Sequence, residues 1–209
     1  MYKILLADAH PVVRTGLKFV VEEFNRSTEI HEVSNGDEII AKLKKDKFDL
    51  IIMDIRMPGT DALDIVQFIK MRYKDTKVLI FTSSPEELYA SRLIKEGVNG
   101  FISKNTELDE LKKAIQLVLN GRIYISEKLM ERLAYDSFSN KPLNPFSTLS
   151  TREFEVASRI LSGECLTDIA NSLQLHQSTV GTHKARLYEK LNVGNILQLK
   201  DLASFYGVI

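Results

Sequence analysis

The sequence has little of what disulfide-stabilised or membrane-spanning proteins require. Its 209 residues include one cysteine and no tryptophan. A single cysteine cannot form an internal disulfide, so a hydrophobic core must hold the fold, and a reducing compartment is the simpler environment. Because a free cysteine usually packs as a small hydrophobe, we expect Cys165 to be a packing residue and not a reactive thiol.

Long apolar segments are also missing. No stretch of the sequence approaches the roughly 18 apolar residues of a membrane span. The first apolar run ends at Asp8, which is too early for the core of a signal peptide. We therefore predict a cytoplasmic protein that does not associate with membranes.

Neither sign of charge is in excess. Lysine and arginine together number 28, as do aspartate and glutamate. From Leu149 to the end, six basic residues again face six acidic ones. Because a basic excess is the usual electrostatic footprint of nucleic-acid binding, any such function must rest on where individual charges lie.

The first 120 residues alternate short apolar runs with helical patterns. The runs lie at residues 4–7, 29–34, 50–53, 78–81 and 101–102, and the last helix ends near Gly121. Strands that are apolar on both faces and alternate with helices predict a parallel sheet covered on both sides. The predicted fold class is therefore α/β, with a doubly wound, five-stranded parallel sheet.

A polar side chain follows four of these runs, namely Asp8, Asp54, Thr82 and Lys104. In a doubly wound fold, ligands bind at the carboxyl ends of the strands. Two carboxylates, a hydroxyl and an ammonium suit a phosphoryl group with Mg2+, which favours one or two carboxylates together with phosphate and water oxygens. An aspartate can act as the nucleophile toward a phosphodonor, while the lysine and threonine would orient the phosphoryl oxygens.

The segment Met53-Asp54-Ile55-Arg56-Met57-Pro58-Gly59 and the strand-end residues resemble the receiver domain of two-component response regulators. The resemblance covers about residues 2–120 and implies a flavodoxin-like fold. It also implies that a sensor histidine kinase phosphorylates Asp54. Asp8, Asp54 and the backbone carbonyl of Arg56 would then be the Mg2+ ligands.

The same resemblance assigns three residues to sensing and stabilising the phosphoryl group. Thr82 would be the switch hydroxyl and Lys104 the phosphate-binding lysine. Phe101, three residues before the lysine, would occupy the aromatic switch position.

One departure from the family pattern falls in this pocket. The family normally carries two acidic residues after the first strand, whereas here the run is Asp8-Ala9-His10-Pro11. Because Ala9 cannot ligate, we expect weaker Mg2+ binding and slower phosphorylation, and we interpret His10 as a surface or capping residue. An alternative stays open: a regulator that is not phosphorylated and binds DNA constitutively or responds through protein contacts.

A segment with linker composition follows. Residues 135–148 include two prolines, two asparagines and four serines or threonines, a composition typical of loops. We predict a receiver domain at 1–122, a linker at 123–147 with a short helix at 126–133, and a second domain at 148–209.

The second domain has helical patterns only. Ser150 with Glu153 has the spacing of a capping box, and the helix that follows ends at Gly163. A short helix at 167–173 and a longer one at 178–192 flank a brief break, which is the pattern of a helix-turn-helix. We therefore predict an all-α helix-turn-helix domain.

Three segments of this domain resemble the LuxR-type DNA-binding domain over about residues 147–207, and the pairing with a receiver resembles the NarL/FixJ family. They are Thr167-Asp168-Ile169-Ala170, Ser178-Thr179-Val180-Gly181-Thr182-His183 and Lys190-Leu191. The resemblance implies a DNA-binding transcription regulator, not a turnover enzyme, whose second helix enters the major groove.

Helical geometry of 100° per residue puts Val180, Leu187 and Leu191 on the core side of this helix. The predicted DNA-binding residues are Ser178, Thr179, Gly181, Thr182, His183, Lys184, Ala185, Arg186 and Lys190. Arg186 can reach a guanine or a phosphate, whereas the histidine and the lysines are better placed for phosphates. Because Glu189 opposes phosphate binding, we expect weak monomer affinity and an active homodimer.

Two further alternatives stay open. The zero net charge after Leu149 is compatible with a protein-interaction adaptor that uses the helix-turn-helix without DNA. The final helix, 197–205, either pairs two DNA-binding domains or packs on its own domain.

Overall fold

The computed structural model describes residues 2–24, 27–58, 62–84, 86–138, 144–206 and 208. The chain divides into two compact units, residues 1–134 and 135–209. No helix among the described residues is both long enough and apolar enough to cross a membrane.

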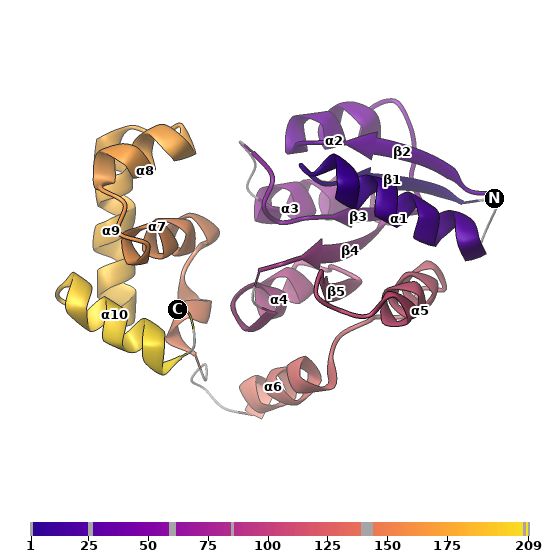
Figure 1. Ribbon diagram of the computed structural model, residues 1–209. Coiled ribbons are helices and arrows are strands. Elements are labelled where there is room, and N and C mark those ends of the chain that lie inside the picture. The colour runs from indigo at the N-terminus through magenta and orange to yellow at the C-terminus, as the bar shows by residue number, and fades with distance from the viewer. Residues whose placement is uncertain are drawn as a thin grey trace. The chain divides into compact units, whose positions relative to one another are not determined.

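The first unit contains a five-stranded, all-parallel sheet with strand order β2-β1-β3-β4-β5 (Figure 1). Its elements are β1 Lys3–Ala7, α1 Pro11–Phe24, β2 Glu29–Val33, α2 Gly36–Leu43, β3 Leu50–Met53, α3 Ala62–Arg72, β4 Lys77–Thr82, α4 Glu86–Lys95, β5 Gly100–Ser103 and α5 Leu108–Leu119. The predicted α/β fold class is confirmed. The strand order reverses between β1 and β3, which is where ligands bind in such folds.

Both faces of this sheet are covered. Along β1, Ile4 and Leu6 point toward the core formed with α1 and α5, whereas Leu5 and Ala7 point toward the core formed with α2, α3 and α4. This alternation follows from the two-residue period of a strand. In β1 and β3, which are buried on both faces, polar side chains can reach solvent only at the strand ends.

Helix α6, Glu127–Phe138, is longer than the helix predicted at 126–133. Its Leu129 is buried in the core shared with α3 and α4. Ser126 accepts a hydrogen bond from the Leu129 N–H (3.0 Å) and donates one to Glu86 (2.7 Å). The first half of the predicted linker therefore belongs to the first compact unit.

The chain just before α6 is tied to the edge of the sheet. The Phe101 N–H donates to the Tyr124 carbonyl and the Tyr124 N–H donates to the Asn99 carbonyl, each at 3.0 Å. The centre of the predicted linker, 139–143, lies outside the described residues.

The second unit is helical. Its elements are the 3-10 helix η1 Pro145–Thr148 and the helices α7 Thr151–Leu161, α8 Leu166–Leu173, α9 Gln177–Leu191 and α10 Ile196–Phe205. The predicted capping box between Ser150 and Glu153 is present. Phe146, at the end of the predicted linker, is buried against Phe154 in an edge-to-face contact with ring centroids 6.5 Å apart.

The prediction for Cys165 was wrong. The residue is exposed at the N-cap of α8, and its Sγ lies 3.0 Å from Oδ2 of Asp168. The position before the first helical turn faces solvent here, so the apolar stripe of the helix begins only later, at Ile169.

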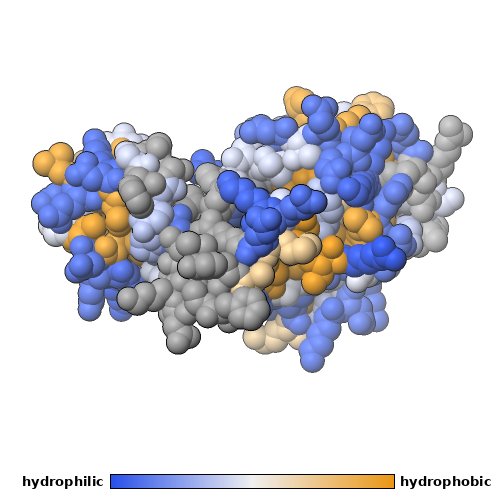
Figure 2. Space-filling model, turned by 90° about the horizontal axis from the view of Figure 1, so that it is seen from below, coloured by the Kyte–Doolittle hydropathy of each residue, from blue (hydrophilic) through white to orange (hydrophobic). Residues whose placement is uncertain are grey.

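Apolar side chains are also exposed on both units. Examples are Val12 and Phe19 on α1 and Leu197 on α10. On the face that Figure 2 shows, hydrophilic residues predominate and apolar areas lie between them. Leu199 and Ala203 of α10 are fully buried, so this helix does pack on its own domain.

Candidate functional sites

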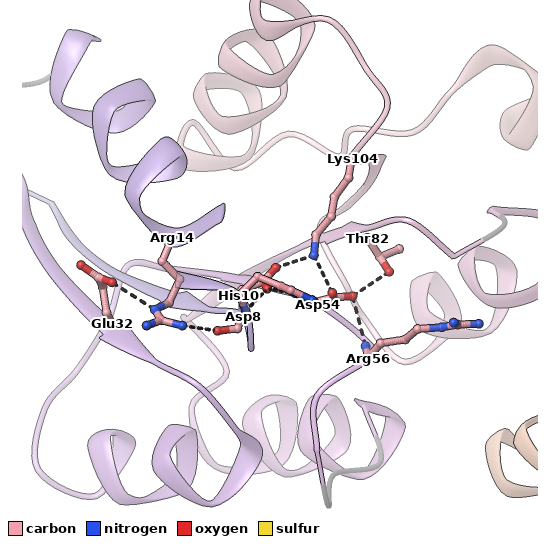
Figure 3. A network of polar contacts seen from close by, with 8 residues as sticks. All are labelled: Asp8, His10, Arg14, Glu32, Asp54, Arg56, Thr82 and Lys104. Carbon is pink, nitrogen blue, oxygen red and sulfur yellow. Dashed lines mark hydrogen bonds and ion pairs between the residues drawn. The ribbon is translucent and has the colours of Figure 1, made fainter. Parts of the chain in front are cut away.

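The four predicted strand-end residues converge (Figure 3). The Thr82 hydroxyl donates to Oδ1 of Asp54 over 2.7 Å, and Nζ of Lys104 lies 2.6 Å from Oδ2 of the same aspartate. The ammonium also lies 2.5 Å from Oδ2 of Asp8. This convergence follows from the parallel register: Ala7 pairs with Met53, so β1 and β3 end at one level, and Thr82 pairs with Ser103 at the ends of β4 and β5.

The pocket holds two buried carboxylates and one ammonium. Asp8 is 1% exposed and Asp54 is 4% exposed. Burial lowers the pKa of Lys104, but its hydrogen bonds to both aspartates outweigh burial and raise that pKa above its ordinary value. The lysine therefore stays charged at neutral pH, and the pocket has one cation for two carboxylates.

A divalent cation suits this deficit. Carboxylate oxygens are preferred ligands of Mg2+, and ligand atoms of Asp8, His10 and Asp54 all lie within 4.8 Å of one another. Arg56, whose carbonyl is the third predicted ligand, is held beside the pocket because its backbone N–H donates to Oδ1 of Asp54 (3.1 Å). The residues present therefore fit a metal ion.

Two further residues contact Asp8: His10, which the sequence analysis interpreted as a surface or capping residue, and Arg14, which it did not identify. The backbone N–H of His10 donates to Oδ1 of Asp8 (2.8 Å), and Nδ1 of its ring lies 3.0 Å from the same oxygen. Arg14 on α1 donates from Nη1 to the Asp8 carbonyl (2.6 Å) and from Nε to Glu32 (3.0 Å). The arginine lies four residues after the histidine, a helical spacing that could have indicated it.

Phe101, the predicted aromatic switch residue, is 1% exposed and packs in the core shared with α3 and α4. Its ring is therefore inside the unit, while its backbone holds Tyr124.

The predicted recognition helix, α9, presents two different faces. Val180, Leu187 and Leu191 are buried, as predicted. Six of the predicted DNA-binding residues are exposed, namely Ser178, Thr179, Thr182, Ala185, Arg186 and Lys190, and Gly181 is half-buried. Half-buried Lys184 places its ammonium 5.4 Å from the centroid of the Tyr188 ring. Apart from Ala185, the exposed side chains of α9 are polar or charged.

Two predicted phosphate contacts have other surroundings: exposed Lys190 is paired within its own domain, and His183 is half-buried. Nζ of Lys190 lies 2.7 Å from Oε2 of Glu153, a nearly fully buried carboxylate that also caps α7. Nδ1 of His183 is buried without a hydrogen-bond partner among the described residues, and burial lowers the pKa of this imidazole. At neutral pH the histidine is therefore mostly uncharged and the lysine is already paired.

Both units match known families. Residues 4–116 match the response regulator receiver domain, and residues 147–203 match the bacterial regulatory proteins of the luxR family. The response regulator GacA of Pseudomonas syringae pv. syringae (strain B728a) is 32% identical over 210 residues, covering 100% of this chain and 98% of that protein. The response regulator UvrY of Escherichia coli (strain K12) is 28% identical, covering 100% of this chain and 96% of that protein.

Solved structures show the same fold. RcsB from Salmonella enterica serovar Typhimurium, bound to promoter rprA in the presence of phosphomimetic BeF3-, aligns with a TM-score of 0.69 and 22% identity. The alignment covers 98% of this chain and 99% of RcsB.

Proposed function

The chain belongs to the response regulators that join a receiver domain to a LuxR-type DNA-binding domain, and we propose that a phosphoryl group on Asp54 controls its binding to DNA. It is a DNA-binding regulator of a two-component system, not an enzyme. The observation that carries the proposal is the position of the Asp54 carboxylate, between a hydroxyl donor and an ammonium and beside a second buried carboxylate.

The surroundings of Asp54 explain how it would accept the group. A carboxylate oxygen of Asp54 attacks the phosphorus of a phosphohistidine on a sensor histidine kinase, and the bond from phosphorus to the histidine nitrogen breaks. The Lys104 ammonium and the Thr82 hydroxyl, which now bind the carboxylate, would move to the phosphoryl oxygens. Asp8, Asp54 and the Arg56 carbonyl would hold Mg2+, which supplies positive charge to the transferring group, and the lack of a carboxylate at Ala9 makes this binding weak.

Thr82 also offers a route out of the pocket. Its Oγ1 accepts a hydrogen bond from the Ser84 N–H (3.2 Å) in the segment that leads to α4. At the start of α4, Glu86 accepts from Ser126, which precedes α6. A hydroxyl drawn toward a phosphoryl group would shift this segment, and the Glu86–Ser126 hydrogen bond would pass the shift to α6.

The partners in this proposal are a sensor histidine kinase, DNA and a second copy of the chain. The exposed face of α9 would enter the major groove, with Thr182, Ala185 and Arg186 near base edges. A homodimer would compensate for the small number of free cations on that face. We place this action in the cytoplasm, where a regulator of this kind meets its DNA.

Phosphodonor incorporation tests the proposal. We expect the wild-type chain, incubated with a divalent cation and a small phosphodonor, to gain the mass of one phosphoryl group and to bind DNA more tightly. Asp54→Asn should lose both responses, because an amide cannot form the acyl phosphate. Asp75→Asn, the same change at an exposed turn, should retain both.

Two outcomes would contradict the proposal. Incorporation that persists in Asp54→Asn would place the phosphoryl group elsewhere. A wild-type chain that incorporates nothing yet binds DNA in a salt-dependent way would support the alternative of a regulator without phosphorylation, because salt dependence reports phosphate contacts.

A further inference from the structure

We propose that His10 is a metal ligand and that it changes the preference of the acidic pocket from Mg2+ toward divalent transition-metal ions of the Co2+, Ni2+ and Zn2+ class. This inference deepens the proposed function, since it rests on the same pocket. It differs from that function in assigning a role to a residue that the phosphoryl chemistry does not use.

The first argument is the position of His10. A ring nitrogen of His10 and carboxylate oxygens of Asp8 and Asp54 lie within 4.8 Å of one another. The histidine follows Ala9 directly, so it lies next to the position at which the ligand set lacks a carboxylate. Its side chain is 70% exposed and can be reached from solvent, whereas both aspartates are held in the core.

The second argument is charge. Oδ2 of Asp8 is buried, and its close partner is the Lys104 ammonium, which it shares with Asp54. A buried carboxylate without a full complement of donors is costly. A cation held by both aspartates and by the imidazole would relieve that cost without adding negative charge to the site.

The third argument is ligand chemistry. Mg2+ takes oxygen ligands almost entirely, whereas imidazole nitrogen suits ions that come later in the first transition series. A carboxylate at the position of Ala9 would serve Mg2+ well. Replacing that oxygen donor with a neighbouring nitrogen donor lowers the advantage of Mg2+ and raises that of Co2+, Ni2+ and Zn2+.

The contact between the His10 ring and Asp8 shows where such a cation would lie. Nδ1 is 3.0 Å from Oδ1 of Asp8, and a cation held by both residues would take the place of the proton between these two atoms.

Calorimetric titration of the full chain with Co2+ and, separately, with Mg2+ tests the inference. We expect His10→Ala to weaken Co2+ binding by about 10-fold or more, as loss of a ligand or its support does, and to leave Mg2+ binding nearly unchanged. His10→Gln keeps a donor for Asp8 without an imidazole and should behave like His10→Ala. His176→Ala removes an exposed histidine far along the sequence and should change neither affinity.

Ala9→Asp provides the reciprocal variant. By restoring a carboxylate, it should strengthen Mg2+ binding and reduce the ratio of Co2+ to Mg2+ affinity. The visible absorption of bound Co2+ should also differ between the wild type and His10→Gln, because a nitrogen ligand is replaced by an oxygen ligand or water.

The inference is overturned if His10→Ala and His10→Gln bind Co2+ as tightly as the wild type, or if both ions lose affinity equally. Neither result touches the proposed function, which fails only if Asp54 incorporates no phosphoryl group. A wild-type chain that binds Mg2+ much more tightly than Co2+ would also overturn it.

Discussion

The two units place their functional side chains in opposite environments. In the receiver, Asp8 and Asp54 are buried at the ends of strands and are paired with half-buried Lys104. In the DNA-binding domain, Thr182, Ala185 and Arg186 lie exposed on one side of a helix whose other side is core. A buried site is built from its own internal contacts, whereas an exposed one is completed only by its partner.

This difference has a consequence for stability. Removing a charge from the receiver pocket leaves an opposite charge buried without its partner, so the fold itself should suffer. Removing a charge from the exposed face of α9 returns that position to water, so only binding should suffer. The predictions below test this contrast, from the largest expected effect to the smallest.

Lys104→Ala should be the most disruptive change. It leaves two buried carboxylates without a cation and should destabilise the receiver by about 3 kcal/mol. A divalent cation should restore part of that loss, because it replaces the missing positive charge. Calorimetric unfolding of the variant with and without the cation would measure both effects. If Lys104→Ala unfolded at the wild-type temperature without the cation, the buried site would not depend on its internal charge pairs.

Arg186→Ala should weaken DNA binding by about 1–3 kcal/mol, roughly 5- to 150-fold, and should make the salt dependence shallower. Its unfolding temperature should stay within the small range typical of surface substitutions. Fluorescence anisotropy with labelled DNA measures the affinity, and Lys200→Ala on α10 is the matched control. Equal losses in both variants would indicate a general charge effect rather than a contact.

Lys190→Met tests a residue of an intermediate kind, because this lysine lies on the recognition helix but forms an ion pair with Glu153 of α7. It should destabilise the second unit by about 1–2 kcal/mol through loss of a partner for buried Glu153. Burial raises the pKa of Glu153, but the hydrogen bonds from Lys190 and Ser150 together outweigh burial. The pKa of Glu153 is therefore below its ordinary value of 4.5. The pair therefore contributes fully above that pH and loses its contribution as pH falls through the folded-state pKa.

Unfolding of the wild type and Lys190→Met at several pH values measures this contribution. The difference in stability between them should be largest near neutral pH and should shrink below about pH 4.5. Lys200→Met, at an exposed position, should show no such trend. If Lys190→Met instead lost DNA affinity without losing stability, the lysine would be a phosphate contact.

The polar residues at the strand ends, and the fact that they share one pocket, could be predicted from the sequence. Asp8, Asp54, Thr82 and Lys104 each follow an apolar run, and parallel strands bring such positions to one edge. The same logic identified the buried stripe of α9, because its period is fixed by helix geometry.

Features that depend on a distant partner could not be predicted in this way. Lys190 was assigned to DNA because nothing in its own helix indicates that Glu153, on α7, binds it. The length of α6 was underestimated because the polar composition after residue 133 favours a loop. The sequence also did not show that Leu129 packs into the receiver core. His10 lies beside the pocket through the turn after β1, which no periodicity describes.

The attachment of Tyr124 to β5 bears on how copies of the chain can associate. Strand β5 is an edge strand, and an open edge invites sheet-to-sheet pairing and aggregation. Tyr124 occupies part of that edge through backbone hydrogen bonds to the residues on either side of Gly100. A Cβ atom at Gly100 would lie 2.8 Å from the Leu79 side chain and 3.1 Å from the Tyr124 carbonyl oxygen, so the close approach requires glycine. A second receiver cannot simply extend the sheet at this point, which leaves the opposite edge at β2 for any pairing of sheets.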